Sequence, residues 1–184
     1  MGVSGRRRTI TATTMAAMLL FTTAACGDDD PPGPTPPTSS ASASTPPGEA
    51  EARAAITTAY DAYRTAYITA AATADAENKD IAKYTYFPLR SDLVTALQQA
   101  KEQGVTYEGT PTWKVEITSL NLGGTPPTAE LNDCFDTTNW KVLRDGKPAG
   151  SPGQAKKFVV TATAKLIEGA WYIDTSTPHR DQPC

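Results

Sequence analysis

The sequence contains little histidine and little cysteine, and this scarcity excludes several kinds of site. Among 184 residues there are one His and three Cys. A zinc site with several His or Cys ligands and a Ser-His-Asp triad therefore have almost nothing to draw on. A P-loop, a dinucleotide-binding fingerprint and a nucleophile elbow are also missing. We therefore expect neither a metal ion nor a cofactor.

Positive charge is not in excess either. The chain has 17 Lys and Arg against 20 Asp and Glu, for a formal net charge of -3. A nucleic-acid-binding protein needs a basic face, so we expect no nucleic-acid partner. No apolar run is long enough to span a bilayer comfortably. The length allows one domain, or one domain with a tail.

The first 25 residues have the pattern of an export signal. Arg6, Arg7 and Arg8 form a basic start, and residues 9–25 carry no charge. The apolar part of this stretch, residues 15–21, is short, and small residues follow it. A basic start, a short apolar stretch and small residues before a break indicate a signal peptide. We assign residues 1–25 to it and leave them out of the fold.

Cys26 follows this segment directly. Residues 23–26 read Thr-Ala-Ala-Cys, which resembles the bacterial lipobox, where a Cys after small residues is diacylated and becomes the new N-terminus. Thr23 stands where Leu is commonest. The alternative is ordinary cleavage after Ala25, with Cys26 as a bystander. We expect lipidation at Cys26, because this residue sits at the cleavage site and is followed at once by a Pro-rich segment. Two acyl chains would anchor the protein stably. The expected location is the outer face of the cell membrane.

Residues 26–48 separate Cys26 from the rest of the chain. They are rich in Pro, Ser and Thr and contain no aromatic or branched aliphatic residue. Such a segment cannot bury enough apolar surface to offset the entropy of ordering. We predict a disordered tether here and a single folded domain in residues 49–184, which are long enough for one core.

The periodicity of the domain changes from helical to extended. Ile56, Tyr60, Tyr63 and Tyr67 recur at steps of three and four, which predicts one apolar face on a long first helix. Strand-like alternation and turn residues dominate after Gly104. Helices are expected at residues 49–73, 79–84 and 88–102, and strands at 113–118, 129–137, 139–144, 158–167 and 171–175. This order predicts an α+β fold with N-terminal helices packed on one face of an antiparallel sheet.

Several short segments of the domain carry a family resemblance. They are residues 131–137 (Leu-Asn-Asp-Cys-Phe-Asp-Thr), 145–147 (Asp-Gly-Lys), 169–173 (Gly-Ala-Trp-Tyr-Ile) and 181–184 (Asp-Gln-Pro-Cys). With the helices-then-strands order, they resemble small actinobacterial secreted lipoproteins of the nuclear-transport-factor-2-like (SnoaL-like) superfamily. The resemblance implies a cystatin-like cone, in which helices pack on a curved sheet. The superfamily includes both enzymes, such as ketosteroid isomerase and polyketide cyclases, and non-catalytic binding modules, so fold alone does not choose the function.

Two cysteines remain in the domain. Because cysteines outside the cytosol usually pair, we expect a disulfide between Cys134 and Cys184. The alternative is a redox or nucleophilic thiol, but the chain has no CxxC motif.

Five residues are candidates to line a pocket inside the predicted cone. The candidate pocket-lining residues are Tyr60, Tyr63, Tyr67, Asp133 and Trp171. The alternative for the tyrosines, which we favour, is a core face whose hydroxyl groups reach the rim. Asp133 suits a general base in the manner of an isomerase, whereas the alternative is that Asp133 or Asp136 caps a turn or pairs with Arg or Lys.

These observations lead to one leading functional hypothesis. We expect a lipid-anchored, extracytoplasmic and non-enzymatic module of the cell envelope, which binds a small apolar ligand or an envelope protein and can form a homodimer. The alternative is an isomerase-like or cyclase-like enzyme that acts on a small apolar substrate.

Overall fold

The computed structural model describes residues 48–150 and 155–184. The predicted signal peptide, Cys26 and all but the last residue of the predicted tether lie outside these residues.

Three helices open the folded domain. The long first helix begins after Gly48 with two acidic residues in its first turn, Glu49 and Glu51, where negative charge is favourable to the helix dipole. Asn78 caps the second helix by accepting a hydrogen bond from the Asp80 backbone N–H, as N-cap side chains do. The bounds are α1 Glu49–Thr73, α2 Lys79–Tyr84 and α3 Leu89–Glu102. All three lie where the sequence places them.

The strands form two antiparallel sheets. The larger sheet has the order β2-β3-β6-β7, and the smaller has the order β1-β4-β5. The larger one consists of β2 Thr112–Asn121, β3 Thr128–Asp136, β6 Lys157–Ile167 and β7 Ala170–His179. The smaller one consists of β1 Val105–Gly109, β4 Trp140–Arg144 and β5 Lys147–Pro148.

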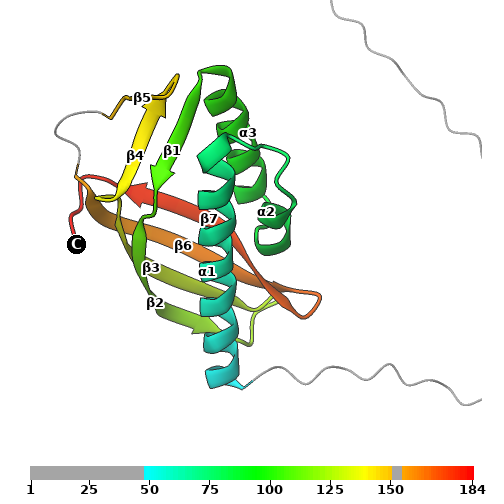
Figure 1. Ribbon diagram of the computed structural model, residues 1–184. Coiled ribbons are helices and arrows are strands. Elements are labelled where there is room, and N and C mark those ends of the chain that lie inside the picture. Colours follow the sequence, from blue (N-terminus) through cyan, green and yellow to red (C-terminus); the bar gives the residue numbers. More distant parts are fainter. Residues whose placement is uncertain (1–47, 151–154) are drawn as a thin grey trace, which may run out of the picture. The chain divides into compact units, whose positions relative to one another are not determined.

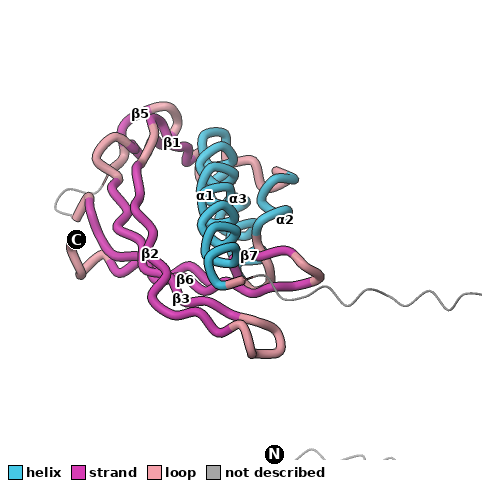
Figure 2. Tube along the Cα trace, turned by 90° about the horizontal axis from the view of Figure 1, so that it is seen from below, coloured by secondary structure: helices cyan, strands magenta, loops and turns pink. Residues whose placement is uncertain are grey.

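The helices cover one face of the larger sheet, and the smaller sheet stands beside α1 (Figures 1 and 2). In β3, Leu131, Asp133 and Phe135 are buried, whereas Asn132 is exposed. This alternation puts every second side chain under the helices. Ile56 and Tyr60 of α1 are completely buried against this face. The domain is therefore an α+β fold with helices packed on a curved antiparallel sheet, which confirms the predicted class.

Four strands differ from the sequence-based prediction. Strands β1 and β5 were not predicted. Strand β2 continues to Asn121 instead of ending near Thr118, and β7 extends to His179 instead of ending near Thr175. The β6–β7 turn is as expected, because Glu168 and Gly169 both have positive φ, at 50° and 84°, as a two-residue hairpin requires.

Within the described part of the chain, none of the helices has both the length and the apolar character needed to cross a membrane.

Candidate ligand-binding cavity

A cavity of about 460 Å³ lies where the helices and the two sheets meet. Tyr63 and Tyr67 of α1 and Leu89 and Leu93 of α3 contribute to its helical wall. Strands β1, β4, β6 and β7 and the end of β3 supply the other walls. The smaller sheet lies beside the second half of α1 (Figure 1).

Aromatic side chains make up much of the cavity wall. Trp140 of β4 is the centre of the cluster. It stacks on Tyr107 with ring centroids 4.4 Å apart, and it meets Tyr67 and Phe135 edge-on at 6.1 and 5.9 Å. Such arrangements are favourable for aromatic rings. The aromatic lining residues are Tyr63, Tyr67, Tyr107, Phe135, Trp140 and Phe158. This wall suits the apolar part of a ligand.

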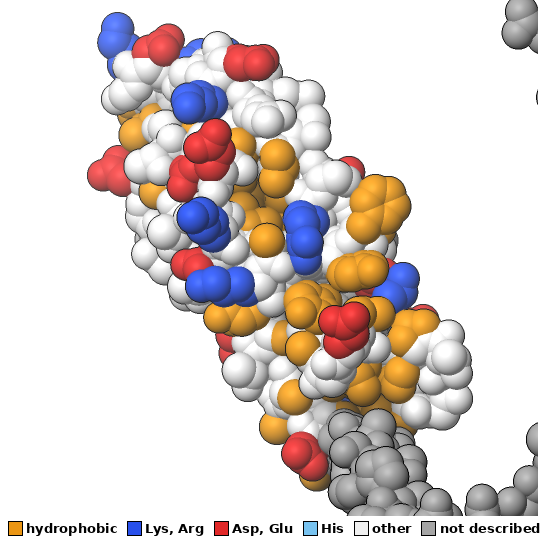
Figure 3. All heavy atoms as spheres, turned by 90° about the vertical axis from the view of Figure 1, so that its right-hand side faces the viewer, with side chains coloured by type: hydrophobic (Ala, Val, Ile, Leu, Met, Phe, Trp, Pro, Cys, Tyr) orange, Lys and Arg blue, Asp and Glu red, His pale blue; other side chains and the backbone are white. Residues whose placement is uncertain are grey.

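All charged side chains that line the cavity are basic. They are Arg64, Lys141, Lys156 and Arg180, and no Asp or Glu is among the lining residues. Arg64 is buried, whereas the other three are exposed. On the face that carries α2 and α3, acidic and basic side chains are intermixed (Figure 3).

Arg64 belongs to a buried polar cluster beneath the cavity. Its Nη2 lies 2.7 Å from Oδ2 of Asp133 and donates to the hydroxyl of Tyr60 at 2.5 Å. Tyr60 in turn donates to the same Asp133 oxygen at 2.8 Å. The backbone N–H of Lys114 donates to Oδ1 of Asp133 at 3.1 Å. Both carboxylate oxygens of Asp133 are therefore occupied within the protein.

The electrostatics keep this cluster in one protonation state. Burial alone would lower the pKa of Arg64, but nearby Tyr63, Tyr60 and Asp133 outweigh it, and the pKa is raised. Burial raises the pKa of Tyr60, and neighbouring Arg64 opposes this only in part. The guanidinium is charged and the phenol is neutral at physiological pH, so the cluster is a fixed ion pair with a neutral donor.

Burial also acts on a tyrosine of the cavity wall. It raises the pKa of Tyr67, with further contributions from Tyr107 and Tyr63, against the opposing effects of Arg64 and Arg180. The Tyr67 hydroxyl thus remains a neutral hydrogen-bonding group in the cavity.

The structure assigns the candidate pocket-lining residues to two different places. Tyr63 and Tyr67 line the cavity. Tyr60, Asp133 and Trp171 do not line it: Tyr60 turns toward Asp133 in the polar cluster, and Trp171 is 6 % exposed in the core. The geometry does not favour the general-base hypothesis for Asp133, because Arg64, Tyr60 and Lys114 already occupy its carboxylate. The alternative hypothesis holds for both carboxylates, since Asp133 pairs with Arg64 and Asp136 accepts from the Thr138 backbone N–H at 2.8 Å.

Several lining residues were not predicted. Trp140, Tyr107 and Phe158 come from three strands, and only the pairing between β1 and β4 and the position of β6 bring them together. The density of aromatic residues along the strands was the available signal. His179 is half-buried at the end of β7, and its Nε2 lies 2.9 Å from the Thr161 hydroxyl.

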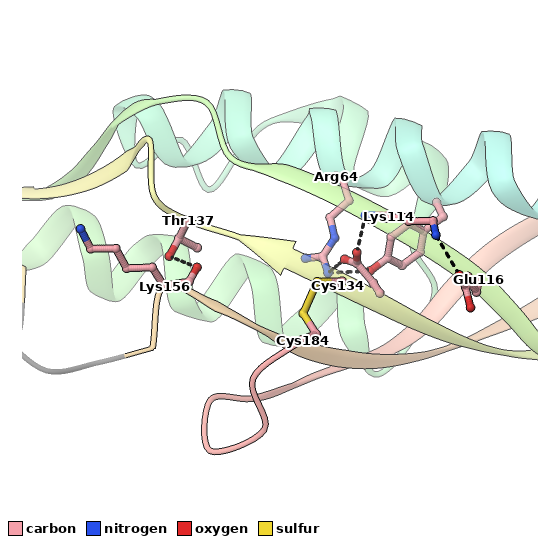
Figure 4. The surroundings of a disulfide bond; sticks show 9 residues. Arg64, Lys114, Glu116, Cys134, Thr137, Lys156 and Cys184 are labelled. Carbon is pink, nitrogen blue, oxygen red and sulfur yellow. Dashed lines mark hydrogen bonds and ion pairs between the residues drawn. A yellow bond between two sulfur atoms is a disulfide. The ribbon is translucent and has the colours of Figure 1, made fainter.

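The two cysteines of the domain form a disulfide between β3 and the C-terminal tail. Arg64 approaches β3 from the side of α1, and the disulfide lies on the other side of the strand (Figure 4). The disulfide therefore fastens the chain end to the outer face of the sheet, away from the polar cluster.

Chemically, the site offers binding groups. In residues 48–150 and 155–184, no group of three or more His, Cys, Asp or Glu side chains is placed to hold a metal ion. The cavity combines aromatic surface, a neutral phenol and cationic groups.

The domain is similar to several solved structures, all at low sequence identity. No protein-family model and no curated protein matches the sequence. Among solved structures, the domain is similar to an NTF2-like protein of unknown function from Silicibacter pomeroyi DSS-3 (18 % identity, TM-score 0.40, covering 72 % of this chain and 98 % of that one). It is similar to a cystatin-like domain of unknown function from Nostoc punctiforme PCC 73102 (16 % identity, TM-score 0.39, covering 68 % of this chain and 77 % of that one). It is also similar to the intermembrane space region of the chloroplast protein ARC6 (10 % identity, TM-score 0.43, covering 67 % of this chain and 92 % of that one).

Proposed function

We propose that this chain is a lipid-anchored extracytoplasmic protein whose folded domain binds a small, largely apolar ligand without catalysing a reaction. The anchoring part of the proposal rests on the sequence alone: the basic and apolar start, Cys26 after small residues, and the Pro-rich tether. A Pro-rich spacer extends about 3.1 Å per residue, so the tether would hold the domain up to roughly 70 Å from the membrane.

The aromatic cavity carries the binding part of the proposal. Ligand pockets typically have volumes of about 300–1,000 Å³, mostly apolar walls and a few polar groups. The cavity of about 460 Å³ between the helices and the sheets has this character. The Tyr107–Trp140 stack gives it a flat apolar surface, on which a ring or an alkyl chain can pack.

The position of Asp133 supports binding rather than catalysis. A general base must be within hydrogen-bond reach of the proton it removes. Asp133 is 1 % exposed and does not line the cavity, so a bound molecule would not reach its carboxylate.

Native mass spectrometry of the protein, released gently from its own membrane fraction, tests the proposal. We expect a stoichiometric adduct of a small molecule in addition to the polypeptide and its lipid. A bare polypeptide, or an adduct that is a second protein, would contradict ligand binding, and the latter would favour a protein-interaction module.

A matched pair of variants locates the adduct. Val142 lines the cavity, whereas its neighbour Leu143 on the same strand does not. Val142→Phe fills the cavity and should remove the adduct, whereas Leu143→Phe should retain it. Loss from both variants, or from neither, would mean that the molecule is bound elsewhere.

A further inference from the structure

Two guanidinium groups are stacked on adjacent aromatic rings in the cavity wall. The Arg64 Cζ lies 4.4 Å from the centroid of the Phe135 ring, and the Arg180 Cζ lies 4.5 Å from that of Phe158. The two phenyl rings are themselves 5.9 Å apart, and all four residues line the cavity. This set, Arg64-Phe135-Phe158-Arg180, is called the arginine row below. It holds two like charges on one patch of wall.

The second arginine of the row has no acidic partner. Among the described residues, no carboxylate forms an ion pair with Arg180, or with Lys156, which lines the same cavity. Some basic side chains outside the cavity are paired, since Lys83, Lys114 and Lys165 each lie within 3.2 Å of a carboxylate oxygen. Others, such as Arg144 and Lys157, form no ion pair within the described residues either. The whole chain has a net charge of -3, so the positive charge at the cavity is local.

Arg64 has an unused donor as well. Asp133 balances its charge through Nη2, but its buried Nε has no hydrogen-bond partner within the described residues. A buried donor without a partner is costly, so such groups are rare in native proteins.

From these observations we propose that the cavity ligand is an amphiphilic anion. The apolar body packs on the Tyr107–Trp140 side, and a carboxylate, sulfonate or phosphate group lies at the arginine row near Lys156. This inference rests on the proposed function and specifies the class of ligand. Arginine is suited to this role because its planar fork binds such oxyanions in a bidentate manner.

Isothermal titration calorimetry of the purified full chain with three matched probes tests the inference. Decanoate, decanol and decyltrimethylammonium each carry an unbranched alkyl chain of similar length and differ in the charge and size of the head group. We expect decanoate to bind about tenfold or more tightly than decanol, and the cationic probe to bind most weakly. The affinity for decanoate should fall as salt is raised, because partly exposed charges are screened.

Paired double variants separate location from net charge. Lys156→Gln with Arg180→Gln removes two cavity charges, whereas Lys157→Gln with Arg144→Gln removes two exposed charges that do not line the cavity. The first variant should lose about tenfold in decanoate affinity with little change for decanol, and the second should bind both probes as the unmodified protein does. Thermal unfolding of both variants confirms that the fold is kept.

Two sources of the anion are distinguishable in the same series. A soluble amphiphile binds as decanoate does, whereas a membrane lipid is extracted from vesicles of phosphatidylcholine mixed with phosphatidylglycerol. Retention of phosphatidylglycerol in preference to phosphatidylcholine, dependent on Lys156 and Arg180, assigns the lipid as the source.

The inference is overturned if decanoate is not preferred over decanol and phosphatidylglycerol is not preferred over zwitterionic phosphatidylcholine, or if both double variants lose affinity equally. These results overturn only the anionic assignment, and the proposed function remains if a small-molecule adduct is still found. Absence of any small-molecule adduct in native mass spectrometry overturns the proposed function itself.

Discussion

Arg64 of α1 and Asp133 of β3 are 69 residues apart in the sequence and meet in the interior with Nη2 and Oδ2 2.7 Å apart. Their side chains are 5 % and 0 % exposed. A buried ion pair does not necessarily stabilise a fold, because removing two charges from water is expensive. Its clearest effect is to fix how α1 lies on the sheet, since only one arrangement of helix and strand joins the two charges.

Removal of one partner of this pair should be severely destabilising. Asp133→Ala leaves the Arg64 guanidinium buried without its carboxylate, and we expect a loss of about 3–5 kcal/mol in the free energy of unfolding. Urea denaturation followed by circular dichroism measures it. Replacing both partners, with Arg64→Met and Asp133→Leu, should cost less than the sum of the single changes.

The exposed pair Lys83–Asp80 provides the control for this experiment. Its side chains are 62 % and 57 % exposed, and exposed pairs contribute about 0–1 kcal/mol. Lys83→Met should therefore change the free energy of unfolding only slightly. Equal losses for Lys83→Met and Asp133→Ala would show that burial does not determine the importance of the pair.

Stability should decline at alkaline pH because of the buried tyrosines. Burial raises the pKa of Tyr60 and the pKa of Tyr67 above the ordinary value. The folded protein therefore keeps these phenolic protons to a higher pH than the unfolded chain does. This contribution is fully present below the unfolded pKa of about 10 and is lost as the pH rises toward the folded values.

Urea denaturation at a series of pH values checks this expectation. Between about pH 8 and pH 11, the free energy of unfolding should be level at first and then fall. Tyr67→Phe removes one of these buried phenols and should make the fall in the free energy of unfolding shallower. Tyr86→Phe is the control, because Tyr86 is 40 % exposed. Stability that rises with pH in this range would contradict the assignment.

The disulfide should contribute substantially to stability. Cys134 and Cys184 are 50 residues apart in the sequence, and a closed loop of that length is worth about 4 kcal/mol in the chain-entropy treatment. Reduction, or Cys134→Ser with Cys184→Ser, should lower the free energy of unfolding by an amount of this order. In the native protein, an alkylating agent should modify neither cysteine of the domain. Mass spectrometry of the alkylated protein, with and without prior reduction, counts the modified cysteines.

The helices and β3 were predictable because their signals are local. The three- and four-residue steps from Ile56 to Tyr67 give α1 its buried face, and the alternation around Asp133 gives β3 its own. Strand β1 was missed because Val105–Gly109 is short and half-exposed, so neither alternation nor length distinguishes it. The cavity could not be predicted, since Tyr107 meets Trp140 only through the β1–β4 pairing, and Arg180 reaches Phe158 only after β7 has paired with β6. Contacts of this kind depend on register and on packing of distant segments.

The lipid anchor makes a final prediction, which concerns Cys26. If Cys26 is diacylated, Cys26→Ser should move the protein from the detergent phase to the aqueous phase when a membrane fraction is partitioned, because the two acyl chains that anchor it are lost. Cys184→Ser is the matched control, since it removes a cysteine of the domain and should leave the protein in the detergent phase. Mass spectrometry of the purified protein should show a mature chain that begins at Cys26 with a diacylglyceryl group. A chain that begins at Cys26 without added lipid, and that stays in the aqueous phase, would instead establish ordinary cleavage after Ala25.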